Sequence, residues 1–281
     1  MPMVEAFKPE YKVDIIMPTY KRLEMFKKCY KALTENPGLE DYRISIWDNG
    51  SGKLFHDYLH QIEKDNWRVK VHYGKKNSGC KVYKIMAEKT KGEHIVFMDD
   101  DVIEFPDNWL SDLVAAYWDA PFPFKVWGML SSNVVRDEKT NGARWPDKDE
   151  SFKESNNYHE LTSPEGRNFL VGSSYGGWLA ITHRYVYLAT QGFANRAVDK
   201  ETGEEKPFFA IDGHYGKQVS DLGMVTGLYL DLEVYHAAGP WWNHELGYDD
   251  LWEAKAEETI KESAKNYLER DPTLTAMKDL L

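Results

Sequence analysis

Three consecutive aspartates, Asp99, Asp100 and Asp101, are the residues of this sequence whose type and spacing best suit chemistry. Adjacent carboxylates repel one another unless a cation lies among them. Side chains alternate along an extended chain, so Asp99 and Asp101 point to the same side. Carboxylate oxygens are ligands that Mg²⁺ and Mn²⁺ prefer. We therefore expect a divalent cation at this acidic run, although a short Asp-x-Asp alone is also typical of a solvated turn.

The acidic run follows one of several apolar segments that alternate with amphipathic segments. Strands are expected at residues 13–17, 42–47, 69–73 and 94–98, and helices at 23–33, 54–64 and 81–90. This alternation predicts a parallel sheet with right-handed crossovers. Ligands of such sheets bind at the carboxyl ends of the strands. Thr19, Asp48 and the acidic run all follow strands in this way.

The pattern changes after Asp101. Further elements are expected as a helix at 108–118, one or two strands at 126–135, ordered structure at 169–181, a helix from about His183, a helix and a strand within 207–229, and a strand at 228–235 that leads into His236. The polar stretch 136–167 has little periodicity, which is typical of a functional loop such as a lid. Residues 251–268 have the pattern of a charged amphipathic helix.

The bulk composition limits the classes of protein and of partner. The chain has 281 residues, 42% of them hydrophobic, enough for a sizeable core, and a formal net charge of −11 that disfavours a polyanionic partner. Its two cysteines, Cys29 and Cys80, form no zinc-ribbon pair and fit a reducing compartment. Residues 1–11 lack the apolar stretch of a secretion signal, and no apolar run is long enough for a membrane span. We expect a cytoplasmic protein; the sequence carries no sign of its oligomeric state.

In their order and spacing, these motifs resemble family 2 glycosyltransferases with the A-type nucleotide-diphospho-sugar (GT-A) fold. The resemblance is carried by residues 14–20, 46–51, 77–79, 97–101, 106–107, 176–177, 192–193, 211–212 and 234–236. It implies an α/β fold with a Rossmann-like mixed, mostly parallel sheet flanked by helices. It also implies one domain at 1–245, with a nucleotide-binding half at 13–110 and an acceptor-binding half at 111–245, followed by a C-terminal helical extension at 246–281.

The resemblance also implies roles for residues on the donor side. Thr19, Tyr20 and Arg22 line the nucleotide pocket, Asp48 binds the base, Asn77 and Lys81 contact the nucleotide, Asp99 or Asp100 meets the ribose, and Asp101 and His236 hold Mn²⁺ or Mg²⁺. Simpler readings stand beside several of these roles. Asp48 suits a turn, Asn77 a helix cap, Lys81 a surface position, and His236 a histidine bonded to backbone.

The acceptor side carries the implied catalytic base. Asp212 occupies the position from which family members with an inverting mechanism deprotonate the acceptor hydroxyl. Ile211 departs from the usual Glu-Asp pair there, so His214 is the second candidate for the base, and a helix starting at Gly213 would make Asp212 a cap. Gly176, Gly177 and Trp178 are expected near the acceptor, with Trp178 either a platform for a sugar or a core residue.

The resulting hypothesis is a hexosyl- or pentosyltransferase that takes its sugar from a nucleotide-diphospho-sugar, with UDP as the expected nucleotide. A glycan is the preferred acceptor, and a modified base of viral DNA ranks second. Two hypotheses of other classes use similar features: a nucleotidyltransferase and a non-catalytic sugar-binding module. The first normally has a glycine-rich loop after its first strand, which residues 18–22 lack. The second does not need an intact acidic run.

Overall fold

The computed structural model describes residues 8–121, 123–124, 127–134, 159–172, 176–193 and 211–237, with the side chains of 211–213 outside the description. The chain divides into two compact units, one formed by residues 1–136 and 143–237 and the other by 137–142 and 238–281. The second unit lies outside the described residues. The same is true of the helix predicted at 251–268, of the proposed boundary at residue 245, and of most of the loop predicted at 136–167.

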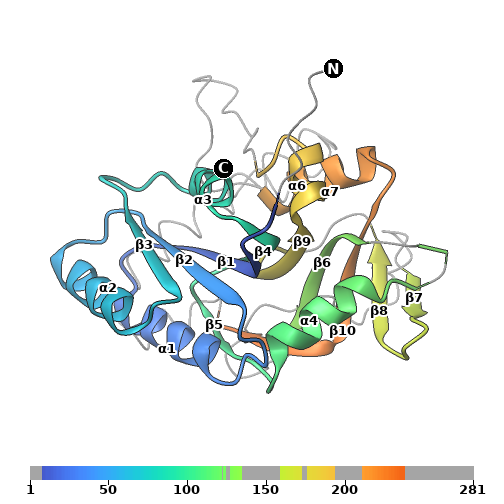
Figure 1. Cartoon of the computed structure of the whole chain (residues 1–281), viewed down its shortest axis with the longest axis horizontal. Helices are drawn as coiled ribbons and strands as arrows, with labels where there is room; N and C mark the ends of the chain where they lie inside the picture. Colours follow the sequence, from blue (N-terminus) through green and yellow to red (C-terminus); the bar gives the residue numbers. More distant parts are fainter. Residues whose placement is uncertain are drawn as a thin grey trace, which may run out of the picture. The chain divides into compact units, whose positions relative to one another are not determined.

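The first half of the described unit is a run of alternating strands and helices (Figure 1). In chain order these are β1 (Tyr11–Thr19), α1 (Leu23–Thr34), β2 (Tyr42–Asp48), α2 (Lys53–Asp65), β3 (Val69–Tyr73), α3 (Lys81–Lys89) and β4 (Gly92–Met98). The four strands are parallel and lie in the order β3-β2-β1-β4. The predicted strands and helices of this half are confirmed, with ends shifted by one or two residues.

The second half extends the same sheet in mixed directions. Its elements are β5 (Val102–Glu104), α4 (Trp109–Trp118), β6 (Trp127–Val134), β7 (His159–Thr162), β8 (Asn168–Gly172), β9 (Leu179–His183), α6 (Arg184–Ala189), α7 (Ile211–Asp221) and β10 (Val225–His236). The sheet continues from β4 as β9-β6-β10-β8-β7, and β5 pairs with β10. Among the described strands of this half, β6 and β10 are the pair that runs parallel. The expected α/β class, a mixed sheet flanked by helices, is confirmed.

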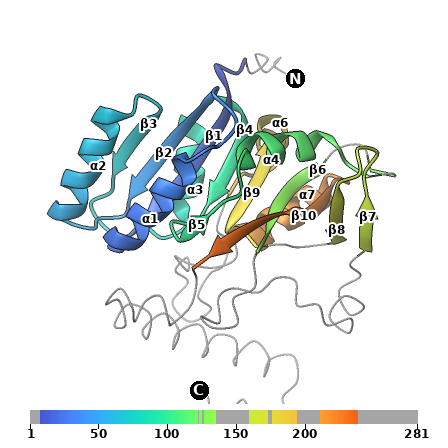
Figure 2. The ribbon, with the colours of Figure 1, turned by 90° about the horizontal axis from the view of Figure 1, so that it is seen from below.

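Helices cover both faces of the sheet because its central strands are apolar on both sides (Figure 2). In β1, Ile15 and Met17 pack on the face covered by α1, α2 and α4. Ile16 points the other way, toward α3, α6 and α7. This period of two along a buried strand places successive residues on opposite faces. It also determines which side chains can meet beyond the strand ends.

The sequence did not predict two short strands of the structure, β5 and β7. β5 has three residues and β7 has four, too few for an alternating pattern to be recognised. β5 forms only by pairing with β10, more than a hundred residues away in the chain. β7 forms by pairing with β8 in a stretch expected to be a loop. Residues 126–135, expected as one or two strands, contribute the single strand β6.

Candidate active site

The candidate site lies where the winding of the sheet reverses. β1 pairs in parallel with β2 on one side and with β4 on the other, and α1 and α3 cover opposite faces of the sheet. In open sheets of this kind, ligands bind at the carboxyl ends of the strands at such a switch point. Thr19 ends β1, Asp48 ends β2, and Asp99 follows β4. The fold thus brings together three strand ends that are widely separated in the sequence.

Each aspartate of the acidic run has its own set of partners. Asp100 is 5% exposed; it accepts a hydrogen bond from Thr19 Oγ1 at 2.7 Å and pairs with Arg22. Asp101 is also buried and accepts from Arg22 Nη1 at 2.8 Å. The Asp99 side chain is 45% exposed, and Tyr83 Oη lies 3.3 Å from its Oδ1. Of the two residues expected near the ribose, Asp99 is therefore the one open to solvent.

His236 joins the acidic run through the pairing of two strands. β10 runs antiparallel to β5 and places His236 opposite Val102, the residue after Asp101. The amide of Ala237 donates to the carbonyl of Asp101 at 2.8 Å. Consequently His236 Nε2 lies 2.9 Å from Asp101 Oδ1 and 3.6 Å from Asp99 Oδ2. The two predicted metal ligands are thus neighbours in space, and Asp99 completes the group.

The donor atoms of Asp99, Asp101 and His236 suit a divalent cation. They all lie within 4.8 Å of one another, close enough to share one ion. Two carboxylate oxygens match Mg²⁺ or Mn²⁺, and the imidazole nitrogen shifts the preference toward Mn²⁺. Three protein ligands leave coordination positions for oxygens of a substrate. The residues present therefore fit the metal that the sequence predicts.

The electrostatics of the site are dominated by Arg22 and His236. Burial would raise the pKa of Asp101, but the Arg22 guanidinium and then His236 hold that pKa well below its usual range. Burial also acts to lower the pKa of His236, but Asp101 outweighs it, so the pKa of His236 is raised. Without a metal, the site therefore favours an ionised Asp101 facing a protonated histidine. A metal at His236 must displace that proton.

Asp48 closes the turn that follows β2. It is fully buried, and its Oδ1 accepts from the amide of Ser51 at 2.9 Å and from the Ser51 hydroxyl. His56 Nε2 lies 2.5 Å from the other carboxylate oxygen. The amide of Asn49 donates to the Thr19 carbonyl at 2.9 Å, which ties this turn to the end of β1. The turn-forming reading of Asp48 is therefore correct, and its contact with a base stays a prediction.

The other predicted nucleotide contacts lie on the loops around this turn. Tyr20 is half-buried, with Lys21 Nζ 4.9 Å from its ring centroid. Asn77 Oδ1 accepts from the amide of Gly79 at 2.9 Å and so shapes the approach to α3. Lys81, the first residue of α3, is exposed. Asn77 thus has the structural role of a turn residue, and the nucleotide contacts of all three stay predictions.

Trp178 is a buried support of the site. It is 8% exposed, and its indole Nε1 donates to the Ser132 carbonyl at 3.0 Å. Its ring centroid lies 6.2 Å from that of His236, with 32° between the planes. A Cβ at Gly176 would lie 1.8 Å from the Trp178 ring, so only glycine fits there. Within the described residues, Trp178 packs beside the candidate ligand His236 and presents little surface to a sugar. Gly177 lies between Gly176 and Trp178 in the chain.

Helix α7 carries the two candidates for the catalytic base. The structure describes this helix as Ile211–Asp221, so Asp212 lies within it and does not precede a helix that starts at Gly213. The Asp212 side chain lies outside the described residues. His214 is half-buried, and the next residue, Tyr215, anchors the helix by packing on Phe97 and Phe193. The assignment of the base stays a prediction.

Two features of the site were missed by reasoning from the sequence. The hydroxyl of Tyr83, on the apolar side of α3, donates a hydrogen bond of 2.8 Å to the Met98 carbonyl. The only feature of the sequence that could have indicated this contact is a hydroxyl group among the apolar residues of that helix. Arg22 was expected at the nucleotide, whereas the structure pairs it with Asp100 and Asp101. No sequence pattern indicates a pairing across 78 and 79 positions.

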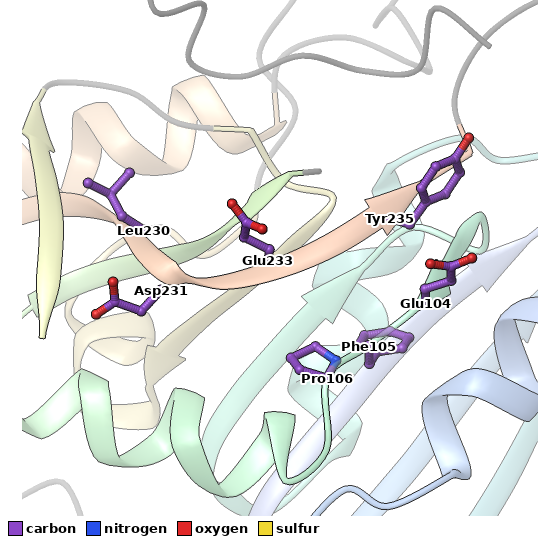
Figure 3. A pocket seen from close by; sticks show the side chains of 7 residues that line it. All are labelled: Glu104, Phe105, Pro106, Leu230, Asp231, Glu233 and Tyr235. Carbon is purple, nitrogen blue, oxygen red and sulfur yellow. The ribbon is translucent and has the colours of Figure 1, made fainter. Parts of the chain in front are cut away.

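A cavity of about 610 Å³ opens beside β10 (Figure 3). Three carboxylates and two aromatic rings contribute to its lining, which consists of Glu104, Phe105, Pro106, Leu230, Asp231, Glu233 and Tyr235. Tyr235 lies opposite Glu104 in the β10–β5 pair and directly precedes His236. The cavity is therefore a neighbour of the candidate metal ligands along the same strand.

A second group of potential ligands, Glu93, His94 and His183, does not form a convincing metal site. Their donor atoms also lie within 4.8 Å of one another. However, Lys12 Nζ already pairs with Glu93 at 2.8 Å. His183 Nδ1 accepts from the amide of Tyr185 at 3.1 Å, which in the neutral ring puts the proton on Nε2, the atom that faces Glu93. That nitrogen then has no lone pair for a metal.

Comparisons with known proteins identify the family of this chain and agree with its fold. Residues 14–168 match the family described as glycosyl transferase family 2. The chain therefore belongs to that family and is a glycosyltransferase, as its motifs predict. The nucleotidyltransferase and sugar-binding-module hypotheses lose their support. No curated protein matches the sequence significantly.

Solved structures share the fold at low sequence identity. The mannosyltransferase PcManGT from Pyrobaculum calidifontis, in complex with GDP-Man and Mn²⁺, has a TM-score of 0.59 at 16% identity, over 93% of this chain and 67% of its own. GalNAc-T7 with UDP, GalNAc and Mn²⁺ has a TM-score of 0.54 at 14% identity, over 80% of this chain. S. aureus TarS 1–349 in complex with UDP-GlcNAc has a TM-score of 0.50 at 14% identity, over 96% of this chain and 70% of its own. This chain spans only 43% of the GalNAc-T7 chain.

Proposed function

We propose that this protein is a metal-dependent glycosyltransferase that moves a sugar from a nucleotide-diphospho-sugar to an acceptor hydroxyl. The observation that carries the proposal is the group formed by Asp99, Asp101 and His236 at the carboxyl ends of the central strands. Three solved structures of the same fold bear a nucleotide or nucleotide-sugar, and two of them bear Mn²⁺ as well. Mn²⁺ is the cation we propose for this site.

The donor lies across the switch point of the sheet in this proposal. Asp48 recognises the base, and Thr19, Tyr20, Asn77 and Lys81 border the nucleotide. Asp99 is shared between the ribose and the cation because it is the exposed member of the acidic run. Asp101 and His236 hold the cation, which when bound stabilises the negative charge of the departing diphosphate.

Asp212 is the proposed base, with His214 as the second candidate. A carboxylate on α7 can accept the proton of the acceptor hydroxyl while that oxygen attacks the anomeric carbon from the face opposite the diphosphate. The bond to the diphosphate breaks as the new glycosidic bond forms, so the configuration inverts. Fixed orientation of the two reactants supplies much of the rate in such a step.

Uracil is the proposed base of the donor and a glycan the proposed acceptor. Of the three solved structures compared above, two carry UDP or a UDP-sugar and one carries GDP-Man. The carboxylates of Glu104, Asp231 and Glu233 around the cavity beside β10 disfavour a phosphate-rich acceptor. They accept hydrogen bonds from sugar hydroxyls readily. A nucleic-acid acceptor therefore ranks second.

Thermal unfolding with a panel of UDP-, GDP- and other nucleotide-sugars, each with and without Mn²⁺, tests the proposal. We expect one nucleotide class to raise the melting temperature, and to do so mainly with Mn²⁺ present, because ligands of the native state stabilise it. The stabilising donor should then release a nucleoside diphosphate during turnover. Stabilisation by no member of the panel, or release of pyrophosphate, would contradict the proposal.

A further inference from the structure

Arg22 occupies an unusual position for a residue expected at the nucleotide. Its guanidinium spans two carboxylates, with Nη1 2.8 Å from Asp101 Oδ2 and Nη2 paired with Asp100 Oδ1. The side chain is only 23% exposed. A guanidinium held by two carboxylates in this way has a fixed orientation. It is part of the acidic site before any ligand arrives.

The loop between β1 and α1 holds Arg22 in this position. Its amide donates to the Tyr20 carbonyl at 2.8 Å, and its carbonyl accepts from the amide of Phe26 at 2.8 Å. Lys21, immediately before it, has a left-handed backbone with φ of 61°. A lysine in that region is strained, and such strain persists only where the surrounding structure enforces it. The backbone therefore directs the arginine toward the acidic run.

The charges around the cation site follow from this arrangement. Three carboxylates and one guanidinium give Asp99, Asp100, Asp101 and Arg22 a formal charge of −2 together. Without Arg22 the same group would carry −3. Arg22 repels an incoming cation at short range, and burial limits screening by salt. The donor diphosphate brings further negative charge to the site.

We propose that Arg22 is an internal counter-ion of the metal site, which keeps Asp100 and Asp101 ordered but weakens cation binding until the donor diphosphate is present. This inference rests on the proposed function of the same site. Arg22 acts through the two carboxylates and is thus a positioning residue. Its presence makes the cation and the nucleotide bind as a pair, and it lets the cation leave with the nucleoside diphosphate product.

Titration of the protein with Mn²⁺, followed by the electron paramagnetic resonance signal of free Mn²⁺, tests the proposal without any turnover. In the absence of nucleotide, Arg22→Gln should bind Mn²⁺ about tenfold more tightly than the wild type, because a nearby positive charge is removed. Arg22→Lys keeps the charge and should stay within about threefold of the wild type. Saturating UDP should raise the affinity for Mn²⁺ strongly in the wild type and far less in Arg22→Gln.

Arg43→Gln is the matched control. The Arg43 guanidinium stacks over Trp67 at 4.2 Å near the start of β2, at the end of the sheet opposite the site. Mn²⁺ binding by this variant should equal that of the wild type. Equal or weaker Mn²⁺ affinity in Arg22→Gln without nucleotide, with Arg22→Lys still folded and binding, overturns the counter-ion role. A wild type that binds no Mn²⁺ with or without UDP, or with GDP in its place, overturns the proposed metal site itself.

Discussion

Among single residues of the site, the three adjacent carboxylates differ in their exposure and in their bonding partners. Asp100 is committed to Thr19 and Arg22, and it orders the loop after β1. Asp101 faces both Arg22 and His236. Asp99 keeps an exposed side chain beside the Tyr83 hydroxyl. Three chemically identical side chains thus differ in exposure and partners, and among the described residues Asp99 and Asp101 are the ones grouped with His236 as candidate cation ligands.

Separate variants should distinguish the metal ligand from the base. Asp101→Ala should weaken Mn²⁺-dependent donor binding by about a hundredfold or more and nearly abolish transfer, since it removes a charged ligand. Asp212→Asn should lower kcat by about 10²–10⁴ while leaving donor binding intact, since it removes only the proton acceptor. Calorimetry of donor binding and initial rates of transfer measure the two effects. Near-normal turnover of Asp212→Asn would show that the base lies elsewhere, and His214→Ala would be examined next.

The proximity of Asp101 and His236 could be predicted in part because each residue lies at a strand end that the sequence marks. Asp101 follows an apolar strand, and His236 ends another. The partners of these residues could not be predicted. Arg22 contacts Asp101 across 79 positions of the chain. Tyr83 contacts Asp99 through its hydroxyl group, which lies on the apolar side of α3. Such contacts depend on how helices lie on the sheet, which periodicity does not encode.

At the scale of elements, short segments with no strong pattern position the ligands. β5 has only three residues, yet its pairing with β10 places His236 beside the acidic run. The segment before β9 also contributes to the position of His236. Gly176 lies against the ring of Trp178, and that ring packs near His236. The long parallel strands and their helices could be predicted from the sequence, since their apolar repeats are local. β5 could not, because it exists only through pairing with the distant β10, and β7 could not, because four residues are too few for an alternating pattern.

Gly176→Ala should therefore disturb the site from a distance. A Cβ there would lie 1.8 Å from the Trp178 ring, so the ring must move. We expect a loss of about 1–3 kcal/mol in the free energy of unfolding and weaker Mn²⁺ binding, because the ring no longer supports His236. Urea denaturation and Mn²⁺ titration measure the two effects. Gly166→Ala is the control: it carries a backbone cost at φ 84° with no atom within 4 Å, so Mn²⁺ affinity should stay unchanged.

At the scale of the whole molecule, one sheet holds the site at one end and a cluster of titratable groups at the other. Register pairs His94 of β4 with His183 of β9. His94 is fully buried, and neither of its ring nitrogens has a hydrogen-bond partner of good geometry within the described residues. Burial, aided by the nearby His183, lowers the pKa of His94 to about 4, while Glu93 acts in the opposite direction.

The described residues include no helix long and apolar enough to cross a bilayer.

The stability of the fold should consequently fall in mild acid. In the unfolded chain His94 binds a proton below about pH 6.5, whereas in the folded chain it binds a proton only below about pH 4. Stability is therefore lost as the pH falls through this window, by about 3 kcal/mol when the loss is complete. Urea unfolding between pH 7 and pH 4 measures the slope, to which the lowered pKa of His183 adds with the same sign.

His94→Gln should remove most of this slope, although it lowers stability at neutral pH. His60→Gln, which changes an exposed histidine of α2, should leave the slope as it is. An unchanged slope in His94→Gln would show that acid sensitivity arises at other groups. The comparison does not involve the metal site, so its result is independent of the proposed activity.

Asp99, Asp101 and His236 are proposed to hold a divalent cation together with the donor diphosphate. Crystals grown with UDP and Mn²⁺, measured at the manganese absorption edge, would show this cation and its ligands. We expect one strong anomalous peak in contact with Asp101 and His236, next to the diphosphate, and no such peak in Asp101→Ala. A peak at other residues, or bound UDP with no manganese at this group, would contradict it.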